Sequence, residues 1–321
     1  MLDIPIRVRP AAMAAAAMLV ASGCSAGGGS VPLGAGQAAR PQVQRLETHA
    51  SGTWAKSVFV SDHFVSKVYQ FADSKKGEVI GTITDSAGPG GLDMDAKGNL
   101  YVASEGDFGI NVYAPNTYTA MKTLSDPNEY ITAVAVCPNG RVYATNEFNT
   151  SQGPGDLVYY APGSTEPTGT FSASKLLSAQ FASCDKNNIL WFTYLDTGYQ
   201  MQVASYDGHK VREYGNEGLG DADSASGIQA TSGGYLAIGN TYVGINRYND
   251  PPSKGGPTRA LGCRTGEAIA FAFDRADRDI FEVDSSTSIA KCDRNGAQLY
   301  TIGQGILETA GYAYAFPAGN D

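Results

Sequence analysis

The chain has 321 residues, with 23 Lys and Arg against 32 Asp and Glu, which gives a formal net charge of −9. Its 39 Gly and 15 Pro suit the many turns of one large β-domain. The acidic excess argues against nucleic acid as a ligand, because phosphate backbones require patches of Lys and Arg. Cations or basic partners are favoured instead.

Residues 1–23 are predicted to be a signal peptide. Arg7 and Arg9 precede the apolar residues 11–20, which are too few to span a bilayer as a helix. The sequence Ala-Ser-Gly-Cys at 21–24 resembles a bacterial lipobox, and this resemblance implies that Cys24 is diacylated and becomes the mature N-terminus. Plain secretion stays an alternative, because Ala21 stands where the lipobox prefers Leu.

The protein is predicted to be located in the cell envelope and to contact the membrane only through its lipid anchor. Ser25 is not the Asp that marks inner-membrane retention among lipoproteins, so an outer-membrane or surface location is preferred. Residues 24–52 are rich in Gly, Ala and Gln and are interpreted as a flexible tether. Residues 53–321 are interpreted as one folded domain.

Six copies of one strand pattern follow, and the gaps between their anchor residues are 42, 42, 48, 46 and 44 residues. Repeats of roughly 40–45 residues built from short strands are typical of propeller blades. The pattern predicts an all-β fold, a six-bladed β-propeller. Its anchors, of which the aromatic ones are expected in the core between blades, are Phe59, Tyr101, Tyr143, Trp191, Ala237 and Phe281.

Each repeat has the same internal order of four strands. A Gly- or Ala-led strand such as 91–95 is followed by a turn, by the anchor strand and by two further strands. The first repeat lacks its opening strand, and residues 311–316 near the C-terminus have that pattern. We therefore expect this C-terminal strand to pair with residues 57–62 in blade 1 and to close the ring, which removes the exposed edges of an open sheet.

The order of these segments is similar to a known family. The sequence Gly-Leu-Asp-Met-Asp at 91–95, followed by a short turn and Asn-Leu-Tyr-Val-Ala at 99–103, resembles the NHL-type and gluconolactonase-like (SMP-30-like) six-bladed propellers. The resemblance covers about residues 57–316. It implies the propeller fold, and it also implies a possible metal-dependent activity that has to be tested against the residues present.

Four cysteines remain if Cys24 carries lipid: Cys137, Cys184, Cys263 and Cys292. An even set suits an oxidising compartment, and three pairings are possible. Cys137 and Cys184 end the first strands of adjacent blades, so they are a candidate disulfide. Buried free thiols are the alternative.

The residues directly before the predicted first strands should line the ligand face, where the loops into the first strand and out of the second strand open. The gluconolactonase-like family holds one divalent metal there with a Glu, an Asn and an Asp. Only Glu267 matches this set, so Ca²⁺ or another divalent cation is an alternative and no cofactor is the main prediction. The predicted ring is Gly90, Thr132, Ser178, Ser226, Glu267 and Ala310.

Acidic residues also gather where the second strands end, and two interpretations stay open. They initiate turns by bonding nearby backbone N–H groups, or they form an acidic mouth that attracts a cation, together with Glu129, Glu267 and Glu308. His63 lies beside Asp62 on the same face and is either an exposed turn residue or a general base. The strand-end set is Asp62, Glu105, Glu147, Asp196, Asn240 and Asp284.

These observations favour a lipid-anchored binding module whose mouth takes an unknown small molecule, cation or protein. No Gly-x-Ser-x-Gly, His-Glu-x-x-His or Gly-Lys-Ser/Thr sequence is present, so no catalytic residue is predicted. The alternative is a metal-dependent hydrolase, lactonase or lyase of the gluconolactonase-like or NHL-lyase type, with Glu267 and His63 as its candidate residues.

Overall fold

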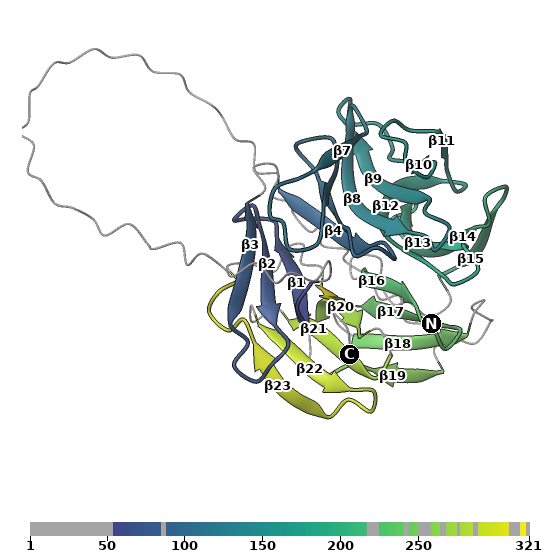
Figure 1. Cartoon of the computed structure of the whole chain (residues 1–321). Coiled ribbons are helices and arrows are strands. Elements are labelled where there is room, and N and C mark those ends of the chain that lie inside the picture. The colour runs from purple at the N-terminus through teal and green to yellow at the C-terminus, as the bar shows by residue number, and fades with distance from the viewer. Residues whose placement is uncertain are drawn as a thin grey trace, which may run out of the picture. The chain divides into compact units, whose positions relative to one another are not determined.

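The chain forms six four-stranded antiparallel sheets, built from 24 strands, in the part that the structure describes (Figure 1). This structure is a computed structural model, and it describes residues 54–84, 88–216, 225–240, 244–249, 258–263, 268–274, 277–284, 288–307 and 315–318. For 225–226, 268–269, 284 and 315–318 only the backbone is described. The predicted six-bladed β-propeller is confirmed. Within the described ranges, no helix is long and apolar enough to cross a membrane.

The innermost strands of neighbouring blades contact one another around the ring. From the innermost strand outward, the blades are as follows. Blade 1 is β24 (Ala315–Ala318), β1 (Ser57–Asp62), β2 (Lys67–Ala72) and β3 (Val79–Thr84); blade 2 is β4 (Pro89–Met94), β5 (Leu100–Ser104), β6 (Gly109–Tyr113) and β7 (Lys122–Ser125); blade 3 is β8 (Glu129–Val136), β9 (Val142–Asn149), β10 (Leu157–Tyr160) and β11 (Gly169–Phe171). Blade 4 is β12 (Leu176–Cys184), β13 (Leu190–Asp196), β14 (Met201–Tyr206) and β15 (Val211–Gly215); blade 5 is β16 (Ala225–Ala230), β17 (Tyr235–Asn240), β18 (Gly244–Asn249) and β19 (Arg259–Leu261); blade 6 is β20 (Ala268–Phe273), β21 (Asp279–Asp284), β22 (Ile289–Asp293) and β23 (Gln298–Ile302).

The ring is closed by the C-terminal strand, as predicted. β24 pairs antiparallel with β1, with Ser57 opposite Ala318 and Val60 opposite Ala315. The described strand runs two residues beyond the predicted end at 316, and residues 311–314 lie outside the described ranges. Blade 1 therefore combines strands from both ends of the folded domain, so its innermost strand depends on the end of the chain.

The aromatic anchors fill the core, as predicted. Phe59 packs with Leu92 and Leu100 between blades 1 and 2, and Trp191 packs with residues of β16 and β17 between blades 4 and 5. Both side chains are at most 1% exposed. Because such rings bury 150–250 Å² each, their recurrence at the blade period places a large share of the apolar contact area between adjacent blades.

Two disulfides cross blade boundaries. Cys137, directly after β8, is bonded to Cys184 at the end of β12, with their Cα atoms 5.0 Å apart. Cys263, after β19, is bonded to Cys292 in β22, with a Cα separation of 5.4 Å. The first bond joins the pair that the sequence suggested. The bonds tie blade 3 to blade 4 and blade 5 to blade 6.

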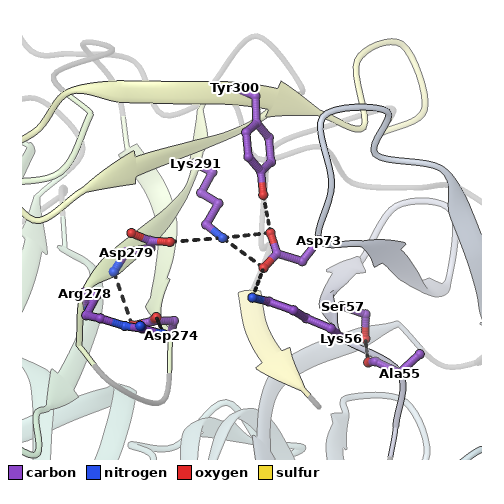
Figure 2. Close-up of polar contacts among 9 residues, drawn as sticks. All are labelled: Ala55, Lys56, Ser57, Asp73, Asp274, Arg278, Asp279, Lys291 and Tyr300. Atoms are coloured by element: carbon purple, nitrogen blue, oxygen red, sulfur yellow. Dashed lines mark hydrogen bonds and ion pairs between the residues drawn. The ribbon is translucent and has the colours of Figure 1, made fainter. Parts of the chain in front are cut away.

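A buried ion network joins blade 6 to blade 1 beside the closing strand (Figure 2). The ammonium of Lys291 lies 2.9 Å from both carboxylate oxygens of Asp73 and 3.1 Å from Asp279, and Tyr300 donates a hydrogen bond to Asp73. The Lys291 side chain is 7% exposed, and the Phe281 ring centroid is 4.9 Å from its nitrogen. Burial by itself lowers the pKa of Lys291, but the two carboxylates more than offset it, and the net pKa is raised. Lys291 is therefore charged, and its ion pairs link blade 6 to blade 1.

Candidate ligand-binding face

Four of the six predicted ring residues, Gly90, Thr132, Ser178 and Ser226, lie inside the first strands rather than before them. β8 begins at Glu129 and β12 at Leu176, so Thr132 and Ser178 belong to strands, at points where the pairing register shifts. β4 begins at Pro89, so Gly90 also lies within a strand at a register shift. This corrects the expected positions: the strands extend further toward the ligand face than the repeat pattern shows, because β-bulges let an irregular segment stay paired.

Gly90 and Thr132 serve packing between blades. The Thr132 hydroxyl lies 3.1 Å from the carbonyl oxygen of Thr145 and 3.0 Å from that of Ala179 in the next blade. A side chain at position 90 would meet the Thr132 carbonyl oxygen, since a Cβ there would lie 2.6 Å from it. The Thr132 hydroxyl is therefore engaged by backbone carbonyl oxygens, and its role as a ligand-face residue stays a prediction.

The structure gives fewer contacts for the other ring candidates. Ser178 is 7% exposed and accepts a hydrogen bond from the side chain of Gln180. Ser226 lies in β16, where only the backbone is described. Glu267, Glu308 and Ala310 lie outside the described ranges. The metal alternative at Glu267 therefore stays a prediction.

A central cavity of about 70 Å³ lies between the innermost strands. Its polar groups each accept a hydrogen bond from a backbone N–H of the next blade: Asp93 from Val136 at 2.6 Å and Gln229 from Phe273 at 2.9 Å. Burial raises the pKa of Asp93 to about 7. The volume suits a few waters, whereas pockets for small organic ligands measure about 300–1,000 Å³. This cavity is therefore too small for most small organic ligands.

Three aromatic side chains form a row on the ligand face across blades 2 and 3. Phe108 lies in the loop between β5 and β6, Tyr130 near the start of β8, and Phe148 near the end of β9. The ring centroids of Phe108 and Tyr130 are 5.5 Å apart, and those of Tyr130 and Phe148 are 4.7 Å apart. All three are half-buried. The row therefore presents ring surface to solvent while its members support one another.

The conformation of Phe108 is unusual for a bulky residue. It ends a tight turn closed by its N–H on the carbonyl of Glu105, with φ of 49°. The same turn occurs in blade 1 with Ser66 and in blade 4 with Tyr199, which is 59% exposed. Left-handed backbone costs an L-residue roughly 1–2 kcal/mol, and the turn alone has no need of an aromatic ring. Strained residues of this kind concentrate at functional sites.

Sequence reasoning missed these aromatic residues, although a signal exists. The segments Glu-Gly-Asp-Phe at 105–108 and Asp-Thr-Gly-Tyr at 196–199 place an aromatic residue at the same position of two exposed loops. The aromatic anchors inside strands are core residues, whereas Phe108 and Tyr199 lie in loops, where only an alignment of one blade with another reveals them.

A cluster of three carboxylates flanks the aromatic row. Asp126 lies in the loop between β7 and β8, Glu129 begins β8, and Asp156 directly precedes β10. The amide nitrogen of Asn146 in β9 donates to Asp126 at 3.0 Å and to Asp156 at 2.7 Å. Asp126 and Asn146 are 4% and 0% exposed. We call Asp126, Glu129, Asn146 and Asp156 the acid cluster.

The acid cluster is electrostatically strained. Burial, reinforced by neighbouring carboxylates, raises the pKa of Glu129 to about 7 and that of Asp126 to about 6, and burial also raises the pKa of Asp156. Among the described residues, Glu129 Oε2 and Asn146 Oδ1 are buried and accept no hydrogen bond. Because a buried acceptor without a partner costs about 1–3 kcal/mol, the cluster is suited to receive a donor or a cation.

Further charged groups continue along the same face. The Nε2 atom of His63 lies 3.4 Å from a carboxylate oxygen of Glu105 in the neighbouring blade. Burial and the charge of Glu105 raise the pKa of Glu147. Asp196, by contrast, accepts hydrogen bonds from two backbone N–H groups of its own turn, at 2.8 and 2.9 Å. Of the strand-end acids, Asp196 thus forms a turn, Glu105 and Glu147 belong to an acidic surface, and Asp62 is buried at the end of β1.

The described residues include no group of three His, Cys, Asp or Glu side chains placed to hold one metal ion. The carboxylates of the acid cluster are thus not grouped around one point, and two of them, Asp126 and Asp156, are bound by the Asn146 amide nitrogen. Such an arrangement suits a group with several hydrogen-bond donors, because its N–H groups can reach oxygens that lie apart. Ca²⁺ instead requires all its oxygen ligands within about 2.3–2.6 Å of one point.

Comparison with known proteins identifies the fold. The sequence matches no model of a known protein family and no curated protein. A chain in the crystal structure of a nidogen/laminin complex is similar, with a TM-score of 0.60 and 12% identity over 81% of this chain and 98% of that one. Hydrazine synthase from Kuenenia stuttgartiensis is also similar, with a TM-score of 0.57 and 11% identity over 74% of this chain and 80% of that one. At these identities the likeness concerns the fold alone.

Proposed function

We propose that this protein is a binding module that holds a cationic protein partner on the ligand face of blades 1 to 3. The observation that carries the proposal is the aromatic row of Phe108, Tyr130 and Phe148, half-exposed and flanked by carboxylates. Aromatic side chains are enriched at the centres of protein interfaces, and the surrounding acids select a partner of opposite charge.

A protein partner fits the dimensions better than a small molecule does. The central cavity of about 70 Å³ is too small for most ligands, whereas the aromatic row spans two blades. The nidogen/laminin structure shows a chain of similar fold within a protein complex, which supports the proposal by analogy of fold only.

We further propose that the module is exported and anchored by lipid at Cys24, on the outer membrane or cell surface. The basic and apolar residues before the lipobox-like residues 21–24 support this address. The two disulfides agree with it, because disulfides persist in oxidising compartments. The order of segments within each repeat supports an NHL-type or gluconolactonase-like affiliation.

The test uses a library of random peptides displayed on phage and selected on the purified full chain. Peptide affinities are then measured for the parent and for Phe108→Ser. The serine keeps the turn, because Ser66 has the same conformation at the corresponding position of blade 1. We expect Phe108→Ser to weaken binding of the selected peptides at least about tenfold.

Leu299→Ser is the matched control, because Leu299 is also an exposed apolar residue, 46% exposed, but lies on the outermost strand of blade 6. It should change the affinities less than about twofold. If the selected peptides bind Phe108→Ser as tightly as the parent, the ligand face of blades 2 and 3 is not the binding surface.

A further inference from the structure

The acid cluster contains negative charge that the described part of the chain does not neutralise. No Lys, Arg or His among the described residues forms an ion pair with Asp126, Glu129 or Asp156. The network at Asp73 and Asp279 is built differently, since Lys291 lies between those two carboxylates. Buried charges in proteins are normally paired, and the described residues supply no cation to the acid cluster.

Two buried oxygens point to the kind of group that completes the cluster. Glu129 Oε2 and Asn146 Oδ1 are shut off from solvent without a hydrogen-bond donor among the described residues. The Asn146 side chain enters the cluster, because its nitrogen bonds both Asp126 and Asp156. A bound group that carries several N–H donors would satisfy these oxygens and the charge together.

The neighbouring rings favour an organic cation over a metal ion. The N–H of Asp126 donates to the carbonyl oxygen of Phe108 at 2.8 Å, so the acid cluster adjoins the aromatic row. Tyr130 and Phe148 of that row lie on β8 and β9, the strands that carry Glu129 and Asn146. Lysine and arginine combine an apolar stem with N–H donors, and their charged groups bind favourably over aromatic faces. The spread of the carboxylates, which includes no set of three metal-ligating side chains in the described ranges, agrees with such a group.

We infer that the acid cluster receives the ammonium or guanidinium group of a Lys or Arg side chain from the protein partner, whose stem packs on Tyr130 and Phe148. This inference rests on the proposed function and names the anchor of the partner. The carboxylates of Asp126, Glu129 and Asp156 accept the N–H donors, and Asn146 fixes two of these carboxylates in place.

The test measures binding of three synthetic decapeptides, of Lys, of Arg and of Glu, to the full chain at 150 mM salt by isothermal titration calorimetry. The variants are Asp126→Asn and Asp156→Asn, which keep an oxygen acceptor toward Asn146. Glu78→Gln is the control, since Glu78 is an exposed acid directly before β3 and outside the cluster. It removes the same charge from the protein as a whole.

We expect the Lys or Arg peptide to bind the parent, each cluster variant to weaken that binding about tenfold, and Glu78→Gln to weaken it less than twofold. An equal effect of all three substitutions would show attraction by net charge only and would overturn the inference. Calcium binding that the cluster variants abolish, without peptide binding, would overturn it in favour of a metal site.

The failure of this inference is distinguishable from that of the proposed function. If selected peptides depend on Phe108 but lack basic residues and ignore Asp126→Asn, the binding face stands and the anchor is wrong. If no selected peptide depends on Phe108, the proposed function fails as well.

Discussion

At the scale of single residues, the same turn recurs on the ligand face of different blades with a different side chain at its last position. Ser66 and Phe108 end equivalent turns with φ of 54° and 49°. Serine serves the turn with a small polar side chain, while phenylalanine adds a ring that contacts Tyr130. The backbone therefore supplies the position and the side chain supplies the surface for recognition.

The acid cluster predicts an unusual pH dependence of stability. The pKa of Glu129 is about 7 in the folded protein, above the ordinary glutamate value of 4.5, so the folded state binds its proton more tightly than the unfolded state does. The free energy of unfolding should then fall as pH rises from about 4.5 to 7. Glu129→Gln removes this penalty, and we expect its Tm to exceed that of the parent by about 2 °C at pH 8.

Thermal melts at several pH values test this expectation. The difference in Tm between Glu129→Gln and the parent should shrink as the pH falls to 4.5 and vanish below about pH 3.5, where the parent carboxyl is protonated in both states. Glu78→Gln provides the control for loss of one exposed acid. A difference that is the same at pH 4.5 and pH 8 would contradict a titrating Glu129.

At the scale of elements, blades are joined by contacts between residues far apart in sequence. Lys291 in β22 and Asp73 after β2 are separated by 218 positions, and their ion pair fastens blade 6 to blade 1. The disulfides fasten two other pairs of blades. Such ties complement the apolar contacts because they fix the orientation of one blade against the next.

Removing the buried lysine should be costly. Lys291→Met leaves Asp73 and Asp279 without their shared cation, and breaking one partner of a buried pair typically costs about 3–5 kcal/mol. Lys56→Met is the control, because the Lys56 side chain is 52% exposed and lies 3.7 Å from Asp73. It should cost less than about 1 kcal/mol.

Urea unfolding of both variants measures these costs. Adding Asp73→Asn to Lys291→Met should recover part of the loss, because it removes one uncompensated charge. If Lys291→Met unfolds at the same urea concentration as the parent, the network contributes no net stability and only the apolar contacts hold this boundary.

At the scale of the whole molecule, the closing strand joins the end of the chain to its first blade. Deleting residues 309–321 removes β24 and exposes the edge of β1, whose residues Val58 and Val60 are fully buried in the parent. We expect the loss of a single cooperative unfolding transition, measured by circular dichroism. A chain that lacks only residues 319–321 keeps β24 and should melt like the parent, and identical melts of all three chains would rule out closure as the source of cooperativity.

The location of the molecule is a separate expectation. Cys24→Ala should release the protein from membranes, because the acyl chains contribute about 0.8 kcal/mol per buried CH₂ and the acidic chain offers no polybasic substitute. Membrane fractionation with a salt wash measures this. Retention of Cys24→Ala in the washed membranes would contradict a lipid anchor at this residue.

The sequence by itself determined the architecture, because the signals for it are local. Short apolar strands such as 100–104 and 157–160, and Gly- and Asn-bearing turns between strands, depend on neighbours a few residues away and recur with the blade period. The missing first strand of blade 1 could be found because the same local pattern occurs near the C-terminus.

Only the tertiary structure decided the candidate site. Asp126, Glu129, Asn146 and Asp156 come from two loops and two strands, and they meet because β8 pairs with β9 and because blade 2 packs on blade 3. The bulges that place Thr132 within a strand arise from that pairing as well. Such long-range contacts leave no periodic signal in the chain, so Glu129 could be named from the sequence while the three residues around it could not.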